Sequence, residues 1–248
     1  MKRYIFMICA LVILSSCDRY TGYRSKSFVL RYDDLAAITL SKNRSFPCIN
    51  VNNDLTRSRF WCGPFREEGL YDSLCDKYGD TEYNEKVYYL VTFEEPSRNA
   101  SDLLSVNVYS DRDFDAEHPA GFSLADIVRF LSCSPKEYIA SGYKSLYRYD
   151  PELVSPGFRS TWGYYYGRPD KEKSEYYPVD KMLCDIVPED LMLLGPDVAY
   201  NPQRSHLKFF SLFFEKMPVV KDSHVITVEV TTDDGRVLSG SIVMDFAE

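Results

Sequence analysis

Three aspartates at alternate positions are the first residues whose spacing could do chemistry. Asp111, Asp113 and Asp115 stand in the segment Asp-Arg-Asp-Phe-Asp, and alternate carboxylates can surround one calcium ion, as in the first half of an EF-hand-type loop. Two positions depart from that loop, because Ala116 stands where a glycine makes the turn and Phe122 where a bidentate glutamate closes the site. The segment therefore predicts either a weak calcium site or a solvated acidic turn.

Aromatic residues form the second pattern. Trp162, Tyr164 and Tyr166 lie on one side of the chain if their segment is extended, and a row of exposed rings can stack on the faces of sugars. Trp61 is a candidate for a second aromatic patch, and residues 143–177 are crowded with tyrosine. The alternative is that these rings supply core area on half-buried strands.

The third feature of the sequence is the absence of common enzyme motifs. The sequence has no nucleophile elbow, no Ser-x-x-Lys, no phosphate-binding loop and no metalloprotease helix. The chain has three histidines, and His118, in His-Pro-Ala-Gly, is expected to be structural. We expect a non-enzymatic protein, and a hydrolase with a carboxylate pair is the less favoured alternative, since glycoside hydrolysis needs only two well-placed acids.

The first residues have the pattern of an export signal. Lys2 and Arg3 precede residues 4–14, which carry no charge, and this run is shorter than the roughly 20 residues of a membrane-spanning helix. It ends Leu-Ser-Ser-Cys at Cys17, which resembles the lipobox of bacterial lipoproteins. That resemblance implies cleavage before Cys17 and acylation of its thiol and new amino group, and each buried methylene of an acyl chain adds about 0.8 kcal/mol to membrane binding. The alternative is an ordinary signal peptide.

These features predict the organisation and location of the chain. Residues 1–16 are expected to be the signal peptide, residues 17–27 the lipidated Cys17 and a polar tether, and residues 28–248 a single β-rich domain. The expected location is the bacterial cell envelope, lipid-anchored, with the outer membrane or the surface favoured. Asp18 does not indicate whether the protein is anchored in the inner or the outer membrane, because sorting rules differ between bacterial phyla.

Composition restricts the partners. The formal net charge is −8, and an acidic chain lacks the basic face that nucleic acid requires. An apolar fraction of 45% is that of a folded chain rather than a disordered one. The expected partners are therefore the membrane, through acylated Cys17, and either a protein or a glycan.

Five cysteines are left after Cys9 and Cys17 are set aside. No Cys-x-x-Cys and no zinc-type Cys/His spacing occurs. An exported protein can form disulfides, and Cys48, Cys62 and Cys75 are close enough in sequence to pair. The alternative is that most of these thiols are small buried apolar groups.

Local patterning predicts many strands and few helices. Strands are expected at residues 28–32, 86–93, 103–109, 206–215, 224–231 and 236–246. A helix is expected from Ser123 until Pro135, because Ser123 and Asp126 form a capping-box variant and apolar residues follow at helical spacing. Further short helical pieces are expected after Pro135 and at residues 188–191, and residues 41–80 are expected to be mostly loops.

The fold class follows from this order of elements. Many strands separated by turns predict an immunoglobulin-like antiparallel β-sandwich with helical insertions. An α+β domain with an antiparallel sheet is the alternative.

One internal stretch carries a family resemblance. Residues 110–127, SDRDFDAEHPAGFSLADI, and the ending at residues 209–238 are similar to uncharacterised envelope lipoproteins of the Bacteroidetes. With the lipobox, these stretches cover about a third of the chain. The resemblance implies an envelope lipoprotein and implies no activity.

Overall fold

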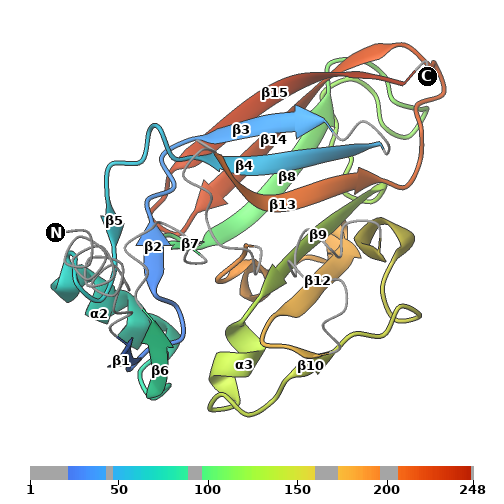
Figure 1. The fold of residues 1–248 in the computed structure, drawn as a ribbon. Helices are drawn as coiled ribbons and strands as arrows, with labels where there is room; N and C mark the ends of the chain where they lie inside the picture. Colours follow the sequence, from blue (N-terminus) through green and yellow to red (C-terminus); the bar gives the residue numbers. More distant parts are fainter. Residues whose placement is uncertain (1–21, 43–46, 89–96, 160–172, 196–205, 247–248) are drawn as a thin grey trace, which may run out of the picture.

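The computed structural model describes residues 22–42, 47–88, 97–159, 173–195 and 206–246. In this part of the chain strands predominate, and two antiparallel sheets face each other as the layers of a β-sandwich-like fold (Figure 1). The prediction of a mainly β, antiparallel sandwich is confirmed. No helix among the described residues has the length and apolar character needed to cross a membrane.

The larger sheet has the strand order β12-β9-β13-β4-β3, and every pairing in it is antiparallel. The central strand, β13, is buried on both faces. Its residues Phe210 and Leu212 enter the core between the sheets, while Phe213 packs on a cluster at the outer face. The strands are β3 (Ile38–Lys42), β4 (Cys48–Asp54), β9 (Val128–Ser134), β12 (Tyr177–Met182) and β13 (His206–Phe214).

The smaller sheet has the order β15-β14-β8. The strands are β8 (Leu103–Ser110), β14 (Ser223–Thr232) and β15 (Val237–Asp245). Buried and half-buried residues alternate along all of β14, as expected for a strand with one face on the core. The turn between β14 and β15 places Gly235 at φ 82°, a left-handed conformation that glycine adopts without strain. The predicted C-terminal hairpin is therefore confirmed.

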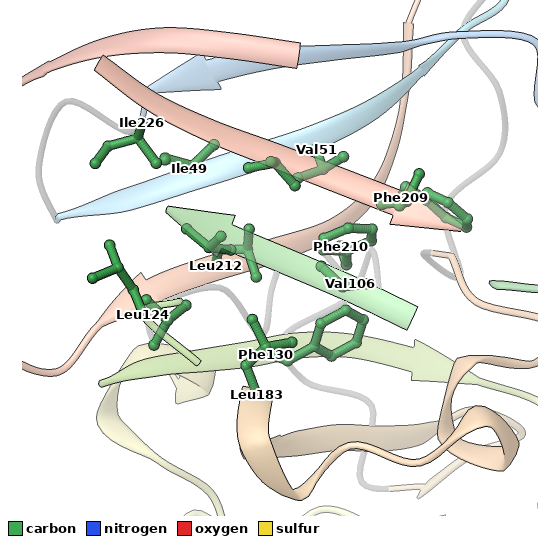
Figure 2. Close-up of a cluster of buried hydrophobic side chains, with 14 of the residues drawn as sticks. Ile49, Val51, Val106, Leu124, Phe130, Leu183, Phe209, Phe210, Leu212 and Ile226 are labelled. Carbon is green, nitrogen blue, oxygen red and sulfur yellow. The ribbon is translucent and has the colours of Figure 1, made fainter. Parts of the chain in front are cut away.

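The main core lies between the two sheets (Figure 2). Ile49, Val51 and Leu212 of the larger sheet meet Val106 and Ile226 of the smaller one. Full burial of one such side chain stabilises the fold by about 1.5–3 kcal/mol. This core therefore holds the layers together and supports the smaller elements at one end.

Those smaller elements gather beside one end of the sandwich, with α2, β1 and β6 at the lower left of Figure 1. Two strands pair as β1-β6, three as β5-β2-β7 and two as β10-β11. The elements are β1 (Gly22–Ser25), β2 (Arg31–Asp33), β5 (Trp61–Cys62), α2 (Glu68–Tyr78), β6 (Glu85–Tyr88), β7 (Ser97–Asn99), α3 (Lys136–Ala140), β10 (Tyr147–Arg148), β11 (Lys173–Ser174), η1 (Leu183–Asp185) and η2 (Pro188–Leu191).

The helix predicted from Ser123 to Pro135 is wrong. Leu124 and Ile127 anchor a turn, in which the amide of Leu124 donates to the carbonyl of Val108. Residues 128–134 then form β9, which lies between β12 and β13 and is covered on both faces. Leu124, Ile127, Val128 and Leu131 satisfy helical spacing, and spacing alone does not distinguish a short buried strand from a helix.

The expected loops at residues 41–80 also need correction, since they contain β4 and α2. The sequence of β4 is Cys-Ile-Asn-Val-Asn-Asn-Asp, and asparagine is depleted in strands. Asn53 is buried, and its amide donates to Asn99 and to the carbonyl of Asp34. Tertiary hydrogen bonds of this kind compensate for a sequence that does not favour a strand.

The expected tether is shorter than predicted. Residues 22–25 form β1, which pairs with β6, and Ser25 and Ser27 are buried. Among the described residues, regular structure therefore begins at Gly22 rather than at residue 28. Cys17 lies outside the described residues, so its lipidation stays a prediction.

Candidate functional site

A small recess lies among the elements beside the sandwich, and we call it the aromatic recess. Its volume is about 270 Å³. Five stretches of chain supply its walls: the connection from β1 to β2, the loop after α2, β6, β7 and the loop between β11 and β12. The lining residues are Phe28, Val29, Leu30, Tyr83, Val87, Arg98, Glu175 and Tyr176.

A buried carboxylate positions one wall of the recess. Asp80 follows Gly79, the left-handed residue that ends α2, and its side chain is fully buried. The carboxylate accepts hydrogen bonds from the amides of Phe28 (2.7 Å) and Val29 (2.8 Å) and from the hydroxyl of Tyr143 (2.9 Å). Burial raises the pKa of Asp80, although these three hydrogen bonds act to lower it. Asp80 thus connects the end of α2 to the wall formed by residues 28–30.

Aromatic rings make up much of the lining. The ring of Phe28 lies edge-on to Tyr83 and Tyr138, with centroids 5.4 and 5.1 Å apart, and tilted to Tyr176 at 5.7 Å. Burial raises the pKa of Tyr83 to about 12, with smaller contributions from Tyr138 and nearby carboxylates. The phenol of Tyr83 is therefore protonated at neutral pH and is able to donate a hydrogen bond as well as accept one.

Two opposite charges face the same recess. Arg98 is only 1% exposed; its guanidinium lies 4.7 Å from the centroid of the Tyr176 ring, and its Nη1 donates to the carbonyl of Ser97 at 2.7 Å. Glu175 is half-buried and also belongs to the lining. The guanidinium of Arg98, which only donates hydrogen bonds, and the carboxylate of Glu175, which only accepts them, thus share one aromatic cavity. This arrangement suits binding of a small ring that carries polar substituents.

The three aspartates predicted as calcium ligands do not converge. Asp111 accepts from the amide of Val225, and Asp113 from the amide of Ala120, both at 2.8 Å, while Asp115 accepts from the amide of His118 at 2.9 Å. Among the described residues no group of three His, Cys, Asp or Glu side chains could hold a metal ion. The geometry therefore corrects the calcium interpretation, because Asp111 joins the turn to β14 while Asp113 and Asp115 stabilise separate parts of the turn itself.

His118 is held in the same turn between two carboxylates. It is 4% exposed, with Nδ1 2.6 Å from Asp115 and Nε2 2.8 Å from Asp126. Burial alone would lower the pKa of His118, but the two carboxylates raise it above its usual value. His118 thus acts as a clamp that joins the two ends of the turn.

The residues predicted to bind a glycan are not tested by the structure. Trp162, Tyr164 and Tyr166 fall outside the described residues, so their role stays a prediction. Trp61 does not form an open aromatic face, because the guanidinium groups of Arg31 and Arg66 lie 4.8 and 4.3 Å from its ring.

The predicted disulfide is not formed. None of Cys48, Cys62, Cys75, Cys133 and Cys184 is joined to another by a disulfide in the structure. Cys62 and Cys75 instead belong to one buried apolar cluster, where burial raises the pKa of Cys62 to about 12 and that of Cys75 to about 11. The alternative of small buried thiols describes both residues.

Sequence reasoning missed the aromatic recess. The abundance of tyrosine at residues 143–177 was a partial signal, and Tyr176 belongs to that stretch. Arg98 and Glu175 carry no local signal, because charged residues at such positions are ordinarily solvated. Comparison with protein-family models, with curated proteins and with solved structures found no match for this chain.

Proposed function

We propose that this chain is a membrane-anchored lipoprotein of the bacterial cell envelope with a non-enzymatic binding role, and that the aromatic recess is its ligand site. The proposal combines the lipobox-like ending at Cys17 with the geometry of the recess. The observation that carries the binding role is a buried arginine and a carboxylate in one aromatic cavity, which is typical of small-ligand sites.

The tether would keep this site near the membrane. Five peptide units separate Cys17 from Gly22, where β1 begins, and an extended chain of that length spans at most about 18 Å. Because β1 pairs with β6, and Val87 of β6 lines the recess, an acylated Cys17 would hold the recess close to the lipid headgroups. Ligands of the envelope would then meet the site at the membrane surface.

The anchor is tested by replacing one residue. Wild-type protein expressed in a bacterium should take up an alkyne fatty-acid probe and migrate as the processed form. Cys17→Ser should be unlabelled and unprocessed, and Cys9→Ser is the matched control that should behave as wild type. Labelling of Cys17→Ser would overturn the anchor.

A protein partner is a second candidate, and one observation favours it. The loop between β13 and β14 exposes Met217, Val219 and Val220, and it lies at the opposite end of the molecule from β1 (Figure 1). Exposed apolar clusters mark interaction surfaces. Crosslinking in native membranes, followed by mass spectrometry, should recover a partner that Val219→Ser together with Val220→Ser no longer captures. A partner retained by that double variant would remove the loop from consideration.

A further inference from the structure

We infer that the aromatic recess binds a single neutral sugar ring. This inference rests on the binding role proposed above and names the ligand class of the same site. It places sugar recognition on Phe28, Tyr83, Arg98, Glu175 and Tyr176, and not on Trp162, Tyr164 and Tyr166, for which glycan binding was predicted.

Size limits the ligand first. Sites for drug-sized molecules measure about 300–1,000 Å³, and the recess, at about 270 Å³, is smaller than that range. One six-membered ring with its substituents matches such a volume, whereas several linked rings do not. The ligand is therefore a monosaccharide or the terminal residue of a glycan.

The walls match the two kinds of surface on a sugar. The C–H groups of a pyranose form an apolar face, and the rings of Phe28, Tyr83 and Tyr176 together with Val29 and Val87 offer apolar surface to it. This lining comes from separate elements, so rings and aliphatic groups surround the cavity rather than forming one flat patch.

The polar groups match the rim of a sugar. Each sugar hydroxyl both donates and accepts a hydrogen bond, so it needs an acceptor and a donor nearby. Glu175 is an acceptor, Arg98 is a donor, and the hydroxyl of Tyr83 can serve as either. Charge-assisted hydrogen bonds to a carboxylate and a guanidinium are the stronger kind. Two adjacent sugar hydroxyls can therefore bond to both Arg98 and Glu175, whereas a ligand group that only donates or only accepts can bond to one of them.

Charge around the recess favours a neutral ring over an acidic one. Carboxylates of Asp80, Glu85 and Glu175 all act on Tyr83 and raise its pKa. Arg98 is the one guanidinium in the described lining. A ligand carboxylate would therefore meet several like charges and a single opposite one.

The wall is also set before a ligand arrives. Asp80 fixes the backbone at Phe28 and Val29, and the amide of Tyr83 donates to the carbonyl of Lys26 at 2.8 Å. A wall whose backbone is already fixed loses little conformational entropy on binding, which strengthens the affinity of a small ligand.

The test uses the full-length protein in detergent and saturation-transfer NMR with glucose, galactose, mannose and N-acetylglucosamine. At least one of these sugars should receive saturation, with Kd measured by titration. Tyr83→Ala and Glu175→Gln should each raise Kd by about tenfold. Tyr177→Ala and Glu137→Gln are the matched controls, because Tyr177 is a half-buried ring outside the lining and Glu137 is exposed on α3; both should leave Kd unchanged.

Each other outcome overturns the inference in a distinct way. Absence of saturation for every sugar removes the ligand class, and phenylalanine or glucuronate binding in their place would show a different class while the binding role stands. Sugar binding that Tyr83→Ala and Glu175→Gln do not weaken removes the site. If Tyr83→Ala fails to fold by circular dichroism, Tyr83→Phe replaces it, since it keeps the ring, loses the hydroxyl and should still weaken binding.

Discussion

Asp80 is the residue at which the structure of the recess and the stability of the domain can be tested together. Asp80→Asn keeps the size and shape of the side chain and replaces one carboxylate oxygen by an amide nitrogen. In the wild type Oδ1 accepts from the amide of Phe28 and the hydroxyl of Tyr143, and Oδ2 accepts from the amide of Val29. An asparagine has one acceptor oxygen, so at least one of these buried donors must face an N–H group.

The expected cost follows from that mismatch. A hydrogen bond to a charged group contributes about 1.5–3 kcal/mol, and a buried amide left without an acceptor costs about 1–3 kcal/mol. Removing a buried charge offsets part of this, so we expect Asp80→Asn to lower the free energy of unfolding by about 3 kcal/mol. For a domain of this size that corresponds to a fall in Tm of about 6–12 °C.

The measurement is urea unfolding at pH 7, followed by circular dichroism, with a calorimetric Tm beside it. Tyr143→Phe is the matched control, because it removes one hydroxyl from Asp80 and keeps both backbone hydrogen bonds. Its expected cost is about 1.5 kcal/mol. If Asp80→Asn costs no more than Tyr143→Phe, the carboxylate does not anchor the wall and the reasoning is wrong.

The pH dependence of the free energy of unfolding provides a second test of Asp80. Burial raises the pKa of Asp80 above its usual 3.8, so between these two values the folded state binds more protons than the unfolded chain. Protonation of Asp80 therefore adds a stabilisation that is fully present below the unfolded pKa and is lost as pH rises through the folded pKa, while the hydrogen bonds of the ionised carboxylate remain above it. Asp80→Asn should remove this part of the pH profile, and an identical profile in the variant would contradict it.

Three further predictions concern the turn, the core and the thiols. The raised pKa of His118 means that its stabilisation is present below about pH 6.5 and is lost as pH rises through the folded pKa; His118→Gln should abolish that slope in a series of melting curves, and an unchanged slope would refute the clamp. Phe130→Ala, at a fully buried ring 4.7 Å from that of Phe210, should cost about 3–5 kcal/mol in urea unfolding, and a cost below about 1 kcal/mol would show that the ring is not in the core. Iodoacetamide at pH 8 should alkylate exposed Cys184 in the native protein and leave buried Cys62 unmodified until denaturant is added; native labelling of Cys62 in the mass spectrum would contradict its burial.

The sequence by itself determined the elements whose signal is local. Alternation along residues 224–231 and the glycine at 235 are properties of neighbouring residues, and they were enough to predict the C-terminal hairpin and, with residues 103–109 and 206–215, the mainly β class. The tertiary structure decided the conformation of elements that depend on the neighbouring strands packed against them. Residues 128–134 are a strand because β12 and β13 lie on either side of them, and no spacing within the segment distinguishes that case from a helix.

The same distinction between sequence and tertiary structure applies to the two candidate sites, the three aspartates and the aromatic recess. Aspartates at alternate positions are visible in one line of sequence, but only the fold shows that their carboxylates bind separate amides instead of one ion. The aromatic recess has only a partial signature in the sequence, because Phe28, Tyr83, Arg98 and Glu175 come from different segments and meet only after the chain has folded. Local periodicity reports the backbone of each element, whereas a binding site is a set of long-range distances, and those distances exist only in the tertiary structure.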